Sequence, residues 1–168
     1  MEHFRTEPGW LSIVREQEAR LLFPSFSSQD ALSLGLSIAH LCADRYCGCA
    51  AISILSDETV VFSYKMEGTG PENEFWMTRK LAASRRTGMS SLRVLLEEEA
   101  GAPLLLPDDP QRAGCFVACG GCFPLRMADG ALRGYLLVSG LNHYEDHQVI
   151  ADALSAHLGI DAPAVTVF

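Results

Sequence analysis

The chain encodes two β-hairpins separated by a long helical segment, and this arrangement is the strongest constraint on its fold. The first hairpin joins Cys49–Leu55 to Thr59–Met66 through a polar turn. The second joins Cys122–Met127 to Ala131–Ser139 through Asp129-Gly130, a dipeptide that tolerates the positive φ of a tight turn. Strands joined in this way are antiparallel. The sequence shows no βαβ alternation with a Gly-rich phosphate loop, which argues against a Rossmann nucleotide site.

The rest of the chain is predicted to be mostly helical, with one further strand at Cys115–Ala118 and a loop at Gly101–Arg112. The predicted helices have apolar residues at spacings of three and four. They are Trp10–Phe23, a helix opened by Ser28 and Asp30, two consecutive helices within Asn73–Ala100 that begin near Asn73 and Ser90, and Tyr144–Leu158. The predicted fold class is therefore α/β of the α+β type, with an antiparallel sheet of about five strands flanked by helices. Residues 1–168 form a single domain in this interpretation.

The charge balance excludes several kinds of partner. The chain has 168 residues and a formal net charge of −8, with 13 Lys and Arg against 21 Asp and Glu. Nucleic acids and anionic membranes both select basic surfaces, so we expect neither as a partner. Met1–Trp10 lacks the apolar region of a secretory signal, and no apolar run has the length of a spanning helix. We therefore expect a soluble, cytoplasmic protein.

Six cysteines include the CxxC pair Cys119-Gly-Gly-Cys122, which has three readings. The pair could be half of a zinc site, a redox pair, or two small buried side chains of the core. A zinc site needs a second half-site, and Cys47-Gly-Cys49 is one residue too tight for the usual knuckle. A redox pair would open a helix, whereas Cys122 leads into a strand. We therefore expect reduced cysteines and no stoichiometric metal.

Four short segments carry side chains that could bind or react. On a helix, Asn73, Trp76 and Lys80 share one face. The others are a glycine pair that permits close backbone approach, two serines at a helix start, and a histidine- and carboxylate-rich helix start. Each segment also has a purely structural reading, since serines and carboxylates cap helices. Each of these segments lies where a helix or strand begins or ends, and functional groups collect at such positions. We therefore expect their side chains to meet in one shared cleft. The residues expected there are Asn73, Trp76, Lys80, Gly121, Glu145, Asp146 and His147.

Taken together, the motifs resemble the haem-degrading-domain family, also called GlcG/HbpS-like, in its short single-domain branch. The motifs include Asp30–Gly35, the run from Asn73 to Lys80, Gly120–Leu125 and Gly134–His147. The resemblance implies a profilin-like fold with a five-stranded antiparallel sheet, a homo-oligomer, and relatives that bind haem. One departure concerns Met89, which precedes two serines where the branch usually has histidine. Methionine can still ligate haem iron but cannot shuttle protons.

Three functions remain open at this point. The first is a small-molecule-binding protein for haem or another tetrapyrrole-like anionic ligand, with His143 or His147 as the axial ligand of the iron. The second is an oligomeric assembly or adaptor protein, in which the same face is a protein interface. The third is an enzyme of haem or small-molecule metabolism. The predicted ligand-binding residues are Asn73, Trp76, Arg79, Lys80, Ser90, Ser91, Gly120, Gly121, Phe123, His143, Glu145, Asp146 and His147.

Overall fold

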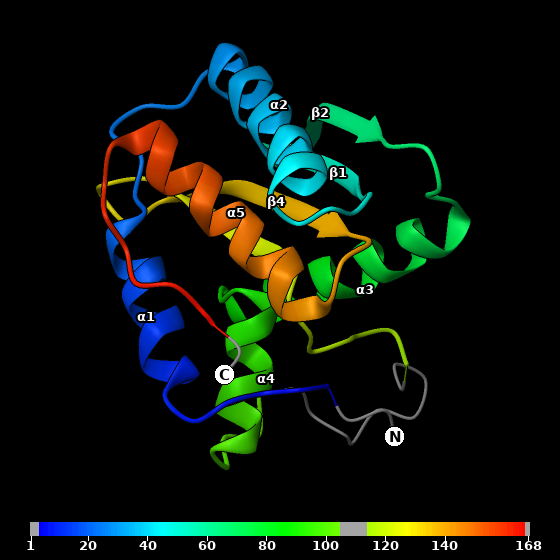
Figure 1. Ribbon diagram of the computed structural model, residues 1–168. Helices are drawn as coiled ribbons and strands as arrows, with labels where there is room; N and C mark the ends of the chain where they lie inside the picture. Colours follow the sequence, from blue (N-terminus) through cyan, green and yellow to red (C-terminus); the bar gives the residue numbers. More distant parts are fainter. Residues whose placement is uncertain (1–3, 105–113, 167–168) are drawn as a thin grey trace.

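A computed structural model describes residues 4–104 and 114–166. Within these residues four strands form one antiparallel sheet in the order β2-β1-β4-β3 (Figure 1). The strands are β1 (Ala51–Ser56), β2 (Thr59–Lys65), β3 (Cys122–Arg126) and β4 (Leu132–Ser139). Both predicted hairpins are confirmed, and they join along the antiparallel pair of β1 and β4.

The structure corrects the expectation of about five strands. Residues 115–118 are not a strand. The backbone N–H of Val117 donates to the carbonyl of Arg79, on the helix that follows the first hairpin, at 3.3 Å. This short apolar run therefore packs beside a helix and contributes no strand to the sheet. The predicted loop Gly101–Arg112 lies partly outside the described residues; Gly101–Leu104 are neither helix nor strand.

Helices cover both faces of the sheet. The helices α2 (Ser28–Asp44) and α5 (His143–Leu158) pack on one face, and α3 (Pro71–Thr87) packs on the other (Figure 1). At one end of the molecule, α1 (Trp10–Arg20) packs against α4 (Ser91–Glu99). Among the described residues, no helix is both long and apolar enough to cross a membrane.

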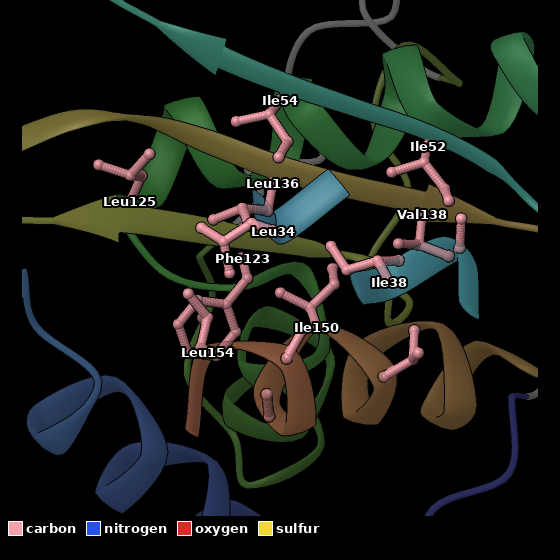
Figure 2. Close-up of a cluster of buried hydrophobic side chains, with 14 of the residues drawn as sticks. Leu34, Ile38, Ile52, Ile54, Phe123, Leu125, Leu136, Val138, Ile150 and Leu154 are labelled. Atoms are coloured by element: carbon pink, nitrogen blue, oxygen red, sulfur yellow. The ribbon is translucent and has the colours of Figure 1, made fainter. Parts of the chain in front are cut away.

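Side chains along the central strands alternate between the two faces of the sheet. This alternation explains why helices are needed on both faces. On β4, Leu136 and Val138 point toward α2 and α5, where they meet Ile150 of α5 (Figure 2). Between them, Leu137 points to the α3 face and packs near Met77. Successive strand residues alternate between faces, so the buried apolar run at positions 135–138 of β4 must be covered on both sides.

The outer strand β2 contains one extra residue. Ile54 of β1 pairs with Phe62, whereas the next residue, Leu55, pairs with Val60. Val61 is therefore left without a partner in β1, as in a β-bulge. The turn before β2 places Asp57 and Glu58 at positive φ of 48° and 62°, which is the conformation of a tight two-residue hairpin turn.

Candidate functional site

Asn73 fixes the start of α3 to the end of β4. Its side-chain oxygen accepts a hydrogen bond from the backbone N–H of Gly70 at 2.9 Å. Its side-chain nitrogen donates to the carbonyl of Ser139 at 2.9 Å. The amide of Asn73 therefore holds the N-terminus of α3 beside the segment that leads into α5.

Lys80 and Asp146 form a buried ion pair below that junction. The ammonium group of Lys80 donates to the Asp146 carboxylate at 2.9 Å and to the carbonyl of Val138 at 3.1 Å. The second carboxylate oxygen accepts from the backbone N–H of Leu141 at 2.9 Å. Burial raises the pKa of Asp146 to about 6, although Lys80 favours the ionised form. The pair joins α3, β4 and α5 at one point.

The glycine pair before β3 leaves room for this junction. Gly121 has φ of 123°, and a Cβ there would collide with the Val138 carbonyl and the Lys80 ammonium group. A Cβ at Gly120 would collide with the carbonyl of His143. Only glycine lets the backbone pass so close to the ion pair and to the start of α5.

His143, the first residue of α5, uses both ring nitrogens in hydrogen bonds. Its Nδ1 accepts from the backbone N–H of Gly120 at 3.3 Å. Its Nε2 lies 2.7 Å from the carbonyl oxygen of Arg5. A carbonyl can only accept, so Nε2 carries the proton and the ring is the neutral tautomer. Burial lowers the pKa of His143, while its hydrogen bond to Arg5 opposes that shift. The imidazole is therefore held neutral.

These groups line a cavity of about 580 Å³ between the N-termini of α3 and α5. One wall is contributed by α3 and the adjacent end of β4: Glu72, Asn73, Trp76, Lys80, Ser139 and Gly140. The opposite wall comes from the start of α5, the N-terminal segment and the loop before β3: Leu141, Asn142, His143, Tyr144, Asp146, Phe4, Arg5 and Cys119. The volume is in the range of small-molecule and cofactor sites.

The expectation of a shared cleft is met for part of the predicted set. Asn73, Trp76, Lys80, His143 and Asp146 all line the cavity. The glycines lie directly behind it, against the ion pair and the start of α5. The cavity lies at the N-termini of both α3 and α5. The positive ends of the two helix dipoles favour an anion at such a place.

Two members of the predicted cleft are corrected by the structure. His147 is fully buried and does not line the cavity. Its Nε2 lies 2.7 Å from the side-chain oxygen of Gln17, and burial lowers its pKa to about 3. Glu145 turns away from the cavity, and its carboxylate accepts from the backbone and side-chain nitrogens of Asn142 at 3.1 and 2.8 Å. Successive helix residues point about 100° apart, so Glu145, Asp146 and His147 cannot all face one cavity.

The remaining predicted residues also lie outside the cavity. Ser90 caps α4, where its hydroxyl accepts from the backbone N–H of Arg93 at 3.2 Å. The Ser91 hydroxyl accepts from the backbone N–H of Cys122 at 3.0 Å. Phe123 is a core residue on the α5 face of the sheet. The guanidinium of Arg79 lies over the ring of Phe75 at 3.9 Å, on the outer side of α3. These side chains position elements around the cavity.

Several cavity residues were not predicted. Phe4 and Arg5 reach it only because the fold brings the N-terminal segment to the start of α5, and nothing in their local sequence signals this. Tyr144 and Cys119 follow from the neighbouring motifs, since they adjoin His143 and Gly120. Cys122, the other CxxC member, is buried away from the cavity, and burial raises its thiol pKa to about 12. Within the residues that the structure describes, no group of three or more His, Cys, Asp or Glu side chains could hold a metal ion.

The arrangement defines an α+β protein with a cavity at two helix starts, and similarity to known proteins identifies the family. The family model described as "Haem degrading protein HbpS-like" matches residues 26–155. The chain belongs to this HbpS-like family. It is 31% identical over 155 residues to a UPF0303 protein of Brucella canis, a match that covers 92% of this chain and 90% of the relative.

Solved structures share the fold. The crystal structure of Ybr137w protein superposes with a TM-score of 0.78 at 24% identity, covering 89% of both chains. The complex of PduOC with haem gives a TM-score of 0.62 at 20% identity, covering 82% of this chain and 98% of the other. HbpS gives 0.59 at 19% identity, with 80% and 90% covered. At these identities the likeness establishes the fold alone.

Proposed function

We propose that the chain is a cytoplasmic binding protein whose cavity takes haem or a closely similar anionic tetrapyrrole. The observation that carries the proposal is the neutral imidazole of His143 in a cavity walled by Trp76 and set between two helix N-termini. The PduOC neighbour, whose structure contains haem, supports this choice of ligand class. None of the six cysteines forms a disulfide, which suits a reducing compartment.

The residues of the cavity fit the chemical parts of haem. A tetrapyrrole is flat and largely apolar, and the rings of Trp76 and Tyr144 offer apolar surface for it. Its carboxylates need a positive partner, which the positive ends of the α3 and α5 helix dipoles would supply. The iron needs an axial ligand, for which neutral imidazole is the common choice. His143 would hold the iron through Nε2 after the proton on that nitrogen passes to Nδ1, which would give up its hydrogen bond from Gly120. The buried Lys80–Asp146 pair would fix the wall behind it.

Absorbance titration with haemin tests the proposal directly. For the wild-type chain we expect a Soret shift that saturates at one haem per chain. His143→Ala should weaken binding by about tenfold or more, because it removes the iron ligand. His40→Ala is the matched control, since His40 is an exposed histidine on α2, far along the sequence from the cavity residues. Iron-free protoporphyrin has no metal for His143 to bind. Its affinity for the wild type and for His143→Ala should therefore be nearly the same.

Two results would count against haem binding. One is a featureless titration of the wild-type chain. The other is an equal loss in His143→Ala and His40→Ala, which would place haem elsewhere.

A second candidate function is assembly, favoured by an exposed phenylalanine–arginine pair on the outer side of α3. Phe75 is 50% exposed, and the guanidinium of Arg79 stacks on its ring. Aromatic residues and arginine are enriched where protein interfaces carry most of their binding energy. Light scattering that gives a defined oligomer together with a featureless haemin titration would favour assembly over ligand binding.

A further inference from the structure

The segment before α1 lies in the mouth of the cavity. Phe4 and Arg5 both line the cavity. The ring of Phe4 packs on His143 with centroids 5.1 Å apart, and on Trp76 in an edge-to-face contact at 6.2 Å. Phe4 therefore covers the imidazole and the aromatic wall together, which are the two surfaces that a flat apolar ligand would use.

The backbone of the same segment accepts a hydrogen bond from the one ring N–H of His143. The carbonyl of Arg5 accepts from Nε2 at 2.7 Å, while Nδ1 is taken by Gly120. A metal that bonds to Nε2 must displace the Arg5 carbonyl, and the Nε2 proton must pass to Nδ1, which then gives up its hydrogen bond from Gly120. Gly120 itself is fixed beneath α5 by its close packing, so the strap is the part that can move away.

The segment is tied down at its far end. Gly9, at φ of 88°, precedes α1, and the first residue of that helix, Trp10, is buried. The indole N–H of Trp10 donates to the carbonyl of Thr166 at 3.0 Å. Residues 4–9 thus form a strap that is anchored at Trp10 and docked at His143 (Figure 1 shows the chain leaving the start of α1 in dark blue). The docked end can leave while the anchor remains.

We propose that this strap is an internal competitor that closes the cavity and that ligand binding releases it. The proposal rests on the function proposed above, and it assigns to that site a form of self-inhibition. The strap supplies to the empty site what the ligand would supply: an apolar ring against Trp76 and a partner for Nε2 of His143. Ligand and docked strap therefore exclude each other. The apparent affinity is then lower than the intrinsic affinity by the fraction of molecules whose strap is open.

Proteolysis of the full chain tests docking without any ligand. Trypsin cleaves after Arg5, and a carbonyl held in a hydrogen bond is a poor substrate. We expect His143→Ala to raise the rate of cleavage after Arg5 severalfold, as followed by mass spectrometry, because it removes the docking partner and leaves the cleavage sequence unchanged. His40→Ala should cleave at the wild-type rate. Equal rates in the wild type and His143→Ala would overturn docking.

Haemin then tests competition. Saturating haemin should raise cleavage after Arg5 in the wild type to the rate of His143→Ala. Phe4→Ala should lower the apparent Kd for haemin by about three- to tenfold, the range of an aromatic contact, because it weakens the strap. Tyr64→Ala, which truncates an exposed aromatic residue on β2, should leave the Kd unchanged.

The two proposals fail in different ways. If haemin does not bind to any variant while His143→Ala still speeds cleavage, the strap is docked and haem is the wrong ligand. If haemin binds equally to the wild type and Phe4→Ala and leaves cleavage after Arg5 unchanged, the binding function stands and the strap is not a competitor.

Discussion

The ammonium group of Lys80 lies 2.9 Å from the carboxylate of Asp146, and each side chain is 3% exposed. The two residues are 66 positions apart, on α3 and α5. Each partner has lost its hydration and depends on the other for compensation. Removing one partner therefore leaves an uncompensated buried charge, whereas removing both does not.

Lys80→Met should lower the free energy of unfolding by about 3–5 kcal/mol, because it leaves the Asp146 carboxylate buried and unpaired. Lys65→Met is the matched control. Lys65 pairs with Glu74, and these side chains are 51% and 47% exposed, so its loss should cost less than about 1 kcal/mol. Adding Asp146→Asn to Lys80→Met should recover a large part of the loss. Urea unfolding measures all of these variants, and similar losses for the two single lysine variants would contradict the prediction.

Gly121→Ala should be among the most destabilising small substitutions in the chain. The added Cβ would meet the Val138 carbonyl and the Lys80 ammonium group, at a φ of 123° that L-residues rarely adopt. We expect a loss of more than about 2 kcal/mol, since strain and steric overlap act together. Gly130→Ala separates the two causes, because Gly130 has φ of 90° with no atom within 4 Å of an added Cβ. Its loss should stay near about 1 kcal/mol, and thermal unfolding compares the two.

Acid should destabilise the protein in part through His147. Its pKa is about 3 in the folded chain against an ordinary value of 6.5. Between these values the unfolded chain binds the proton and the folded chain does not, so stability falls as pH decreases below 6.5. The slope from this one group is at most about 1.4 kcal/mol per pH unit.

His147→Gln should flatten the dependence of the unfolding free energy between pH 6.5 and 5, measured by urea titration. The raised pKa of Asp146 acts in the opposite sense over this range, because the folded chain then binds the extra proton. It is common to the wild type and the variant, so it cancels in the difference. A wild-type slope in His147→Gln would show that His147 is not buried as a neutral ring.

Ligand entry should be visible in the fluorescence of Trp76. The chain has two tryptophans. Trp10, the first residue of α1, is buried against α4, whereas Trp76 lines the cavity. A bound tetrapyrrole should quench both tryptophans, since Trp10 packs on Tyr144, which lines the same cavity. The quenching titration therefore gives a Kd, and Trp76→Ala should raise the Kd for haemin severalfold because it removes apolar surface from the α3 wall. An equal Kd for the wild type and Trp76→Ala would mean that the tetrapyrrole binds away from that wall.

Self-association remains a prediction, and the outer side of α3 is where we expect it. Light scattering at micromolar concentration should give a mass above the 18.3 kDa of one chain. Phe75→Ala should shift the mass toward 18.3 kDa, because it removes the exposed ring on which Arg79 stacks. Tyr64→Ala probes the exposed aromatic residue on β2 instead. If only Tyr64→Ala dissociates the oligomer, the interface lies at the β2 edge. A monomeric wild type would contradict the prediction.

The helical period explains which part of the site was predictable. Asn73, Trp76 and Lys80 were placed on one face by their spacing, and all three line the cavity. The same period, applied to α5, separates Asp146 from its neighbours Glu145 and His147, which were wrongly grouped with it. Phe4 lay beyond prediction because its contacts with Trp76 and His143 exist only in the tertiary fold.

The sheet was predictable where a turn signal accompanied each strand. Both hairpins follow from their turn residues and apolar runs, and both are present. Residues 115–118 had the apolar composition of a strand but no hairpin partner. Composition alone does not provide backbone partners, and this segment finds one on α3.

The bulge at Val61 determines how this chain can associate with others. An edge strand with a regular ladder of free N–H and C=O groups invites the strand of another molecule, and such pairing can continue without limit into fibres. The extra residue in β2 breaks the regular spacing of these groups midway along the strand. Sheet extension from that edge is therefore disfavoured. Assemblies of this chain should be closed and built through side-chain surfaces, and the protein should stay dispersed at high concentration despite an exposed, valine-rich edge.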